Sequence, residues 1–363
     1  MNNSKMESKL AFDFKTNQQI IKKVAFIDSF KGKWTGLEVK ESIYLKELKQ
    51  IATIESIGSS TRIEGSTLTD KEVKQLIDSV KITSFKTRDE QEVFGYYDVL
   101  NLMLDSYDSI EIKENHIHHL HKALLQVSSK DESHRGSYKK LSNKVVANYP
   151  EGKQKIIFNT TAPFLVKGEM ESLISWTNEN IKKEELHPLI IIAVFVYEFL
   201  SIHPYQDGNG RLSRLLTTLL LLRQGYDFMK YASMEIEIEK RKKEYYKALM
   251  SGQKNRGTKK EIINEWILFF LGTLEATINK LEDRYAKIKH KKSYLNDRQK
   301  ELLQFIQKSE PVKISDITSA LTDYTPYTLK KDVKYLTEEG IIKKLGKARA
   351  TIYVINELNK KED

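Results

Sequence analysis

The stretch from Pro188 to Ile202 is almost entirely apolar, and it limits the folds that this chain can adopt. It is shorter than the roughly 20 residues that a membrane-spanning helix needs, and it contains Glu198 and Ser201. A run that is apolar on every side of a helix is typical of a helix buried in a protein core. The sequence therefore predicts a mainly helical fold around a buried helix, and no association with a membrane.

Most of the chain around this stretch shows helical periodicity or helix-capping residues. Thr69 to Glu72 form a capping box at the start of one helix, and Gly58 is expected to end the helix before it. Residues 1–35 give no clear pattern. The further helices are expected at about 37–57, 69–80, 88–108, 113–127, 164–182, 210–225, 238–251 and 259–288.

One segment, residues 138–163, departs from the helical pattern. It contains two short runs typical of strands, Val145-Val146 and Ile156 to Phe158. Tyr149 to Gly152 lie between them and include the turn-forming residues Pro150 and Gly152. The segment is therefore expected to form a β-hairpin.

The end of the chain has a different organisation. Lys287 to Lys292 are strongly basic and are expected to form a linker or the end of a helix. Three short helices follow in the prediction, and two strands come after them, which is the order of a winged helix-turn-helix. The expected elements are helices at 298–308, 315–321 and 326–339 and strands at 341–342 and 351–355.

The composition excludes some kinds of site. The chain has no cysteine, so disulfides, thiolate metal sites and cysteine nucleophiles are excluded. This absence fits a cytoplasmic protein, and no secretory signal is visible. The net charge of +10 is compatible with nucleotides, nucleic acids or acidic partners, and it selects none of them.

The segment from His203 to Arg214 carries the most specific chemistry. Two glycines, Gly208 and Gly210, allow the backbone to approach a ligand closely just where a helix is expected to begin, and a helix N-terminus binds anions. Arg211 and Arg214 add charges suited to phosphate oxygens. His203 can accept a proton near neutral pH, and Asp207 offers a hard oxygen ligand. Together these residues predict a site for phosphoryl or nucleotidyl transfer.

This segment resembles the signature of the Fic family, H-x-F-x-D/E-G-N-G-R-x-x-R. Tyr205 replaces the usual Phe, which normally anchors the loop in the core. The resemblance implies a protein adenylyltransferase, which moves AMP from ATP to a Ser, Thr or Tyr hydroxyl of a target protein. It also implies a helical Fic bundle in which the hairpin at 138–163 is a flap that aligns the target.

The resemblance further implies a role for each residue of the segment. His203 would be the general base, and Asp207 would hold Mg²⁺ against the phosphates. Gly208, Asn209 and Gly210 would surround the α-phosphate, Arg211 would support the β-phosphate, and Arg214 would meet the γ-phosphate. We also expect adenine near Tyr246, with Gln253 as a polar neighbour, although an aromatic pair such as Tyr245-Tyr246 is more often ordinary core.

A second segment, Ser60 to Gly65, resembles the inhibitory motif of Fic proteins, S/T-x-x-x-E-G/N. The resemblance implies that Ser60, Glu64 and Gly65 belong to an N-terminal inhibitory helix. Glu64 would pair with Arg214 and deny it to the γ-phosphate of ATP. The predicted organisation is thus an N-terminal helical region with this helix (1–110), a catalytic core (111–290) and a winged-helix domain (291–363).

Several alternatives remain open at this level. The same fold can remove AMP from a modified target or transfer another phosphate-linked group. The chain can also be a nucleotide-sensing regulator that binds DNA, although the complete set of His203, Asp207 and Arg211 argues against an inactive core. The sequence also leaves open whether the chain forms a homodimer.

DNA binding through the winged helix rests on charge. The wing is basic through four residues, whereas the expected recognition helix is balanced. The wing residues are Lys343, Lys344, Lys347 and Arg349, and the helix residues are Lys330, Lys331 and Lys334 against Asp332, Glu338 and Glu339. A protein-interaction surface is the alternative.

Overall fold

The computed structural model describes residues 6–40, 42–79, 85, 87–148, 154–293, 295–346 and 350–356. The chain divides into two compact units, one of Met1–Thr35 and Leu48–Leu281 and the other of Gly36–Glu47 and Glu282–Asp363. The fold is mainly helical, as predicted, with two short antiparallel hairpins among the described residues. None of the described helices is long and apolar enough to cross a membrane.

The core of the first unit is built around α8 (Pro188–Ile202), the apolar stretch of the sequence. Every residue of α8 after Pro188 is buried. It packs against α7 (Pro163–Lys183) and α9 (Asn209–Arg223), and α9 in turn contacts α5 (Arg88–Ser106). The predicted core helix is therefore confirmed, and the loop between α8 and α9 is held between two buried helices.

The N-terminal helices differ from the prediction. Residues 14–35, which gave no clear pattern, lie in α2 (Phe14–Lys40), which also includes the expected helix start at 37. The next helix, α3 (Ser42–Glu64), begins later than predicted and continues through Gly58, where we expected an end. A Cβ at Gly58 would lie 2.6 Å from side-chain atoms of Arg62 and Asp70. Gly58 therefore permits close packing inside the helix, and the helix ends instead at Gly65, whose φ is 116°.

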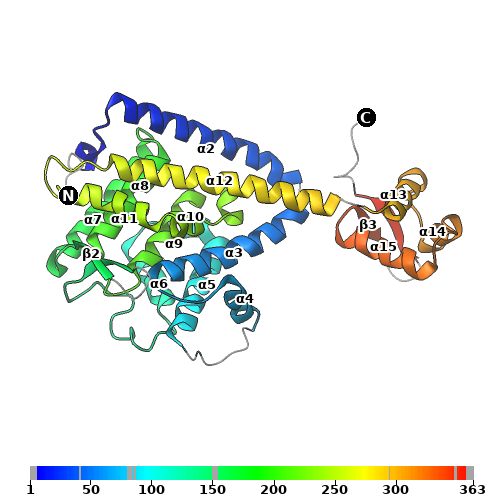
Figure 1. Ribbon diagram of the computed structural model, residues 1–363, viewed down its shortest axis with the longest axis horizontal. Helices are drawn as coiled ribbons and strands as arrows, with labels where there is room; N and C mark the ends of the chain where they lie inside the picture. The colour runs from blue at the N-terminus through cyan, green and yellow to red at the C-terminus, as the bar shows by residue number, and fades with distance from the viewer. Residues whose placement is uncertain are drawn as a thin grey trace. The chain divides into compact units, whose positions relative to one another are not determined.

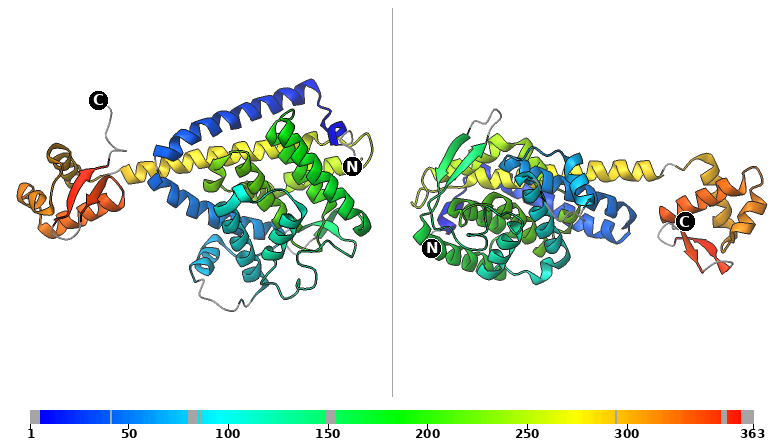
Figure 2. Two further views of the ribbon diagram at one scale, coloured as in Figure 1. Left: turned by 180° about the vertical axis from the view of Figure 1, so that it is seen from behind. Right: turned by 90° about the horizontal axis from the view of Figure 1, so that it is seen from below.

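Other helices cover this core. Alongside α12 (Asn264–Ser293) runs α2 (Figures 1 and 2), and Lys23 Nζ lies 2.5 Å from Glu275 Oε2 between them. The capping box predicted at Thr69 is present at the start of α4 (Asp70–Asp78), and a second one at Thr87 opens α5. The remaining elements here are η1 (Ser8–Leu10), η2 (Tyr107–Ser109), α6 (Glu114–Leu124) and η4 (Asp227–Tyr231).

Two predicted helix boundaries need correction. The helix expected at 238–251 is two helices, α10 (Met234–Lys240) and α11 (Lys242–Gln253), which meet at Arg241. The basic run at 287–292 is not a linker, because it lies in the last turns of α12, so the alternative of a helix end is correct.

The predicted hairpin is confirmed as β1 (Lys144–Asn148) paired with β2 (Gln154–Asn159). The pairing is antiparallel and shifts register between Val145 and Val146, which marks a bulge. The predicted turn, Tyr149 to Gly152, lies outside the described residues.

The second unit contains three helices and a hairpin in the predicted order. They are α13 (Asp297–Ser309), α14 (Ile314–Ala320), α15 (Pro326–Glu338), β3 (Ile342–Leu345) and β4 (Ile352–Ile355). These elements share an apolar core of their own. Lys347 and Arg349 of the predicted wing lie outside the described residues.

Candidate active site

His203 stands where α8 ends, in a left-handed conformation with φ of 54°. Its backbone N–H donates to Phe199 O at 2.9 Å, and its Nδ1 lies 3.2 Å from Leu200 O. Because Nδ1 faces a carbonyl oxygen, it carries the proton, and Nε2 is left as the basic nitrogen. Burial lowers the pKa of His203 to about 4, so the ring is neutral at physiological pH.

Tyr205 anchors the loop in the core, despite its departure from the usual Phe. Its ring is fully buried, and its hydroxyl lies 2.9 Å from His118 Nδ1. The backbone N–H and O of Tyr205 both bond to the side-chain amide of Asn209, each at 2.8 Å. The hydroxyl thus has the partner that a buried tyrosine needs.

His121 supports the same loop from α6. Its ring stacks on Tyr205 at 3.7 Å between centroids. Nδ1 accepts a hydrogen bond from the Gly136 N–H at 2.8 Å, so Nε2 carries the proton and donates to Asp207 O at 3.0 Å. Burial lowers the pKa of His121 to about 3, which keeps this arrangement neutral. His121 therefore fixes the backbone on which the Asp207 side chain stands.

The two glycines of the loop are needed for different reasons. Gly208 adopts a left-handed conformation, with φ of 78°, immediately before α9 begins. Gly210 has no room for a side chain, because a Cβ there would lie 2.1 Å from Glu64 Oε1. The N-terminus of α9 is thus open to a close oxygen ligand, and in this structure the Glu64 carboxylate lies there.

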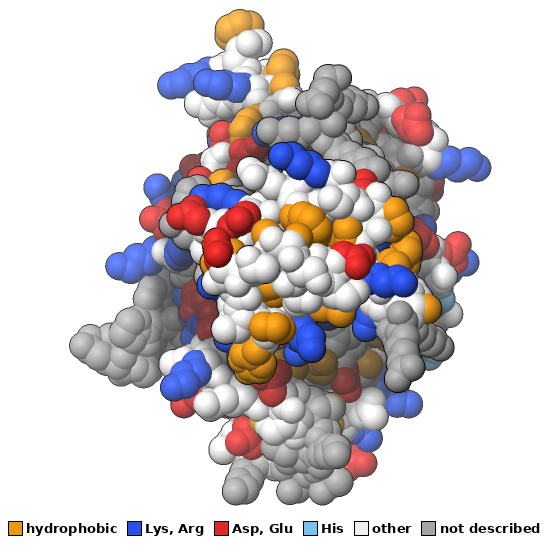
Figure 3. All heavy atoms as spheres, turned by 90° about the vertical axis from the view of Figure 1, so that its right-hand side faces the viewer, with side chains coloured by type: hydrophobic (Ala, Val, Ile, Leu, Met, Phe, Trp, Pro, Cys, Tyr) orange, Lys and Arg blue, Asp and Glu red, His pale blue; other side chains and the backbone are white. Residues whose placement is uncertain are grey.

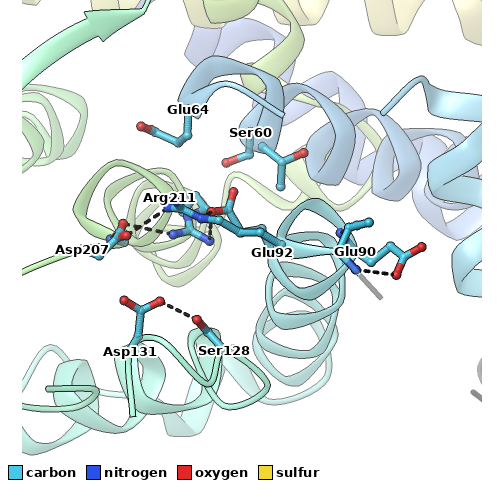
Figure 4. Close-up of polar contacts among 12 residues, drawn as sticks. Ser60, Glu64, Glu90, Glu92, Ser128, Asp131, Asp207 and Arg211 are labelled. Carbon is cyan, nitrogen blue, oxygen red and sulfur yellow. Dashed lines mark hydrogen bonds and ion pairs between the residues drawn. The ribbon is translucent and has the colours of Figure 1, made fainter. Parts of the chain in front are cut away.

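Asp207 and Arg211 form an ion pair beside that terminus. Arg211 NH2 lies 3.2 Å from Asp207 Oδ1, and Figure 4 shows Arg211 between Asp207 and Glu92. Arg88 NH2 lies 3.1 Å from Asp207 Oδ2. Burial by itself would raise the pKa of Asp207, but Arg211, the Gly208 N–H and Arg88 outweigh it and keep the pKa below its usual value. Asp207 is therefore ionised.

Arg214 is buried and bonded to the end of α3. Its Nε donates to Ser60 Oγ at 2.7 Å, and its NH2 donates to Ser60 O at 2.9 Å and to Glu64 Oε1 at 2.7 Å. Burial alone would raise the pKa of Glu64, but Arg214, Arg211 and His203 lower it below its usual value. The structure therefore holds a charged pair between two segments that are far apart in sequence.

These residues surround one cavity of about 300 Å³. It brings together Glu64 and the signature residues His203, Asp207, Gly208, Asn209, Gly210, Arg211 and Arg214. Tyr246 also lines it, with Tyr245, Leu249, Leu200, Lys144, Val145 and Gln206. Gln253 does not line it, because its side-chain amide donates to Ser201 Oγ at 2.5 Å. Ser60 and Gly65 likewise lie outside the lining, and Ser60 contacts the lining residue Arg214 through a hydrogen bond.

Lys139, which belongs to no recognisable sequence motif, links the residues on either side of the hairpin to the end of α8. It is 2 % exposed, and its Nζ lies 2.7 Å from Thr160 Oγ1, 2.8 Å from Asn143 Oδ1 and 3.1 Å from Ile202 O. Asn143 Nδ2 in turn donates to Tyr205 O at 2.8 Å. Burial lowers the pKa of Lys139 to about 8. A lone lysine before a strand gives no sequence signal, since exposed lysines are common there.

We expect Lys139→Met to lower the free energy of unfolding by about 1–3 kcal/mol, because it leaves buried acceptors without their donor. Denaturant unfolding of the whole chain measures this change. The neighbouring exposed Lys140→Met is the matched control and should unfold like the wild type. Equal stability of the two variants would contradict the proposed link.

The site contains one carboxylate suited to a divalent metal. Among the described residues, no group of three or more His, Cys, Asp or Glu side chains could hold a metal ion alone. Mg²⁺, however, is commonly held by one or two carboxylates together with phosphate oxygens and water. The ionised, partly exposed Asp207 in a cavity lined by arginines fits that mode, with Mg²⁺ arriving together with a phosphorylated ligand.

Comparisons with known proteins show similarity to Fic proteins in the part of the chain that contains this site. The family model described as "Fic/DOC family" matches residues 111–221, which contain α8, the whole loop and all but the last two residues of α9. "Protein adenylyltransferase Fic" of Drosophila grimshawi is 28% identical over 184 residues, which are 50% of this chain and 35% of that protein. The protein of the same name from Drosophila melanogaster is 29% identical over 186 residues, with the same shares. The chain thus spans about a third of the length of these relatives.

Solved structures show the same fold. A Fic family protein from Desulfovibrio desulfuricans superposes with a TM-score of 0.64 at 22% identity, and the match covers 96% of this chain and 98% of that one. A Fic domain containing signaling protein from Bacteroides thetaiotaomicron gives a TM-score of 0.59 at 22% identity, over 72% of this chain and 97% of that one. The chain therefore carries a Fic/DOC family domain at residues 111–221, within a mainly helical fold shared with Fic proteins of known structure.

Proposed function

We propose that this chain is a protein adenylyltransferase that moves AMP from ATP to a hydroxyl group of a target protein. The observation that carries the proposal is the single cavity in which a neutral histidine, an ionised aspartate, a helix N-terminus and two arginines meet. Relatives named protein adenylyltransferases support it, although the chain covers only part of their length.

In this proposal His203 takes the proton of the attacking hydroxyl. Its Nε2 is the unprotonated nitrogen, and the Leu200 carbonyl holds the ring in that tautomer. The backbone at Gly208 to Gly210 and the N-terminus of α9 bind the α-phosphate oxygens, where negative charge increases during the transfer. The buried Arg211 Nε makes no hydrogen bond among the described residues, so a phosphate oxygen can accept from it, whereas NH1 faces Glu92 Oε1 at 3.6 Å.

Asp207 would hold Mg²⁺ together with phosphate oxygens, and Mg²⁺ when bound neutralises charge on the transferring nucleotide. Arg88 bonds to Asp207 Oδ2 at 3.1 Å and would compete with a metal for that oxygen. Arg88 is about half exposed and can turn toward solvent.

The Ser60 to Glu64 segment would keep this site inactive. The Glu64 carboxylate lies over Gly210 and bonds to Arg214. It therefore occupies space that the triphosphate would need, and it pairs with the arginine charge that a phosphate would contact. Lys242 donates to Ile63 O at 2.7 Å, and Arg62 bonds to Glu239 and Asp70, so the end of α3 is fixed by contacts outside the cavity too. Autoinhibition within one chain is therefore our explanation for this arrangement.

Incubating the protein with ATP labelled at the α- or the γ-phosphate tests the proposal. Adenylyl transfer leaves the α label on protein and releases the γ label with pyrophosphate. Retention of the γ label alone would instead show a kinase, and retention of neither by wild type and by a variant without Glu64 would overturn the proposal.

Asp207→Ala is expected to raise the Mg²⁺ concentration for half-maximal transfer by at least about tenfold. Loss of a residue that only hydrogen-bonds to a metal ligand typically lowers metal affinity or activity about 10–100-fold. Asp207 would bind the metal directly, so its loss should cost at least as much. A Mg²⁺ titration measures the change, with the exposed Asp105→Ala on α5 as the control. An unchanged titration curve would place the metal ligand elsewhere.

A further inference from the structure

The second unit contains a pair of helices that meets the geometric needs of a helix-turn-helix. The short segment from Leu321 to Thr325 joins α14 to α15, and Thr325 caps α15 through a hydrogen bond from Thr328 N. On the inner side of α15, Leu329, Val333 and Leu336 belong to the unit's own core. The opposite side of α15 is therefore presented to solvent on a folded support.

The charge of that outer side differs from the charge that the sequence suggests. Asp332 appears in the sequence as an acid that balances the neighbouring lysines, but it is buried. Its Oδ2 accepts from Arg298 Nε at 2.5 Å, and its Oδ1 accepts from Gln299 Nε2 at 3.1 Å, both from α13. Asp332 therefore fixes α15 against α13 and contributes no carboxylate to the outer side.

The side chains left on the outer side are mainly basic. Lys330, Lys331 and Lys334 are exposed, and Tyr327 near the start of α15 is 79% exposed. Glu338 is the exposed acid of this helix, and it lies 3.6 Å from Lys334 in the last turn. The N-terminal half of α15 thus presents two adjacent lysines and an aromatic ring.

The neighbouring hairpin adds to this charge. In β3, Ile342 is buried, whereas Lys343, Lys344 and Leu345 are exposed. β3 follows α15 after a turn and contacts it, so these two lysines belong to the same unit, and as neighbours in a strand they point to opposite faces of the hairpin. We name Lys330, Lys331, Lys334, Lys343 and Lys344 the lysine surface.

From these observations we infer that residues 295–346 and 350–356 belong to a winged helix-turn-helix that binds duplex DNA, with α15 as the recognition helix and the lysine surface on the phosphates. A helix-turn-helix places its second helix in the major groove, with the first residues of that helix nearest the bases. Tyr327 and Thr328 hold those positions, while the lysines suit phosphate contacts, which supply most of the affinity.

Apolar area argues against a second protein chain as the partner. Stable protein interfaces bury about 800 Å² on each side around an apolar centre. Among the described residues of this unit, only Tyr327 and Leu345 are large, exposed and hydrophobic. On the face drawn in Figure 3, basic side chains are interspersed with acidic and apolar ones, and no large uniformly positive area is visible.

The test measures fluorescence anisotropy of a labelled random-sequence duplex of about three helical turns with the full-length protein, without ATP. We expect the binding constant to fall steeply as salt rises from about 50 mM to about 200 mM. Lys330→Glu with Lys331→Glu should weaken binding at least tenfold at low salt and reduce the slope of log K against log salt by about two, about one per lysine. Lys343→Glu with Lys344→Glu should act in the same direction.

The matched control is Lys182→Glu with Lys183→Glu, two adjacent exposed lysines at the end of α7 with the same change of charge. It should bind like the wild type. Equal weakening by the control would show that only the net charge of the chain matters, and this would overturn the proposal. Absence of binding at low salt would overturn it too, as would a concentration-dependent dimer that the Lys330 and Lys331 substitutions dissociate.

Circular dichroism establishes that each variant is folded. Lys330→Gln with Lys331→Gln, which introduces no new carboxylate, replaces the charge reversal if that variant fails to fold. Because the measurement needs no ATP, its outcome is independent of adenylyl transfer.

Discussion

His203→Ala is expected to reduce AMP transfer by roughly 10²–10⁴-fold while ATP binding stays nearly unchanged. The factor is that of a positioned general base. ATP binding should persist because His203 in the proposal contacts the hydroxyl nucleophile, whereas α9 and the arginines contact the phosphates. Incorporation of α-labelled AMP and a separate nucleotide-binding measurement together distinguish the two steps.

The pH dependence gives a second check on His203. Burial lowers its pKa to about 4, so the base stays unprotonated above that value and loses activity only as pH falls toward it. We therefore expect no loss of rate between about pH 8 and about pH 6 from this group. The exposed His119→Ala on α6 is the control. Near-normal turnover by His203→Ala would reject its role as the base.

Glu64→Gly is expected to raise self-modification and target modification roughly tenfold or more. The substitution removes a charge-assisted hydrogen bond to Arg214, which is worth about 1.5–3 kcal/mol, and a negative charge that faces the triphosphate. Arg214 is buried, so once unpaired it favours an anion, and ATP supplies one. Incorporation of α-labelled AMP measures the gain.

Two further variants test whether this gain comes from loss of the Glu64 charge and from release of Arg214. Glu64→Gln keeps a long side chain in the last turn of α3 and removes only its charge, so it should also increase transfer. Glu64→Gly with Arg214→Ala should lose most of the gain, because the freed arginine acts on the phosphate. Glu171→Gln, an exposed carboxylate on α7, is the neutral control. Equal incorporation by wild type and Glu64→Gly would show that this segment does not inhibit.

The sequence predicted the parts of the fold that depend on neighbouring residues. The apolar run of α8, the capping box at Thr69 and the hairpin at β1 and β2 were all predicted from local patterns, and each is present. The loop from His203 to Arg214 was also predictable as a unit, because its residues are contiguous and lie between two helices. Short-range periodicity and capping act over a few residues, so a sequence displays them directly.

Local sequence patterns did not predict the contacts between segments that are distant in the chain. Gly58 suggested a helix end, but α3 continues, and the close approach of Asp70 from α4 requires a glycine there. Gln253 suggested a polar neighbour for adenine, whereas Ser201 engages its side chain outside the cavity. Spacing in the sequence does not show which side of a helix meets which neighbour.

The charged residues show most clearly which features depend on the sequence alone and which depend on the tertiary structure. The sequence by itself determined that His203, Asp207, Arg211 and Arg214 belong to one site, since twelve contiguous residues carry them all. Only the tertiary structure decided that Lys139 supports this loop, that the Glu64 carboxylate stands over Gly210, and that Asp332 faces inward. The physical reason is that a charge acts through its burial and its partners in space, and folding sets both by joining residues that are distant in the chain.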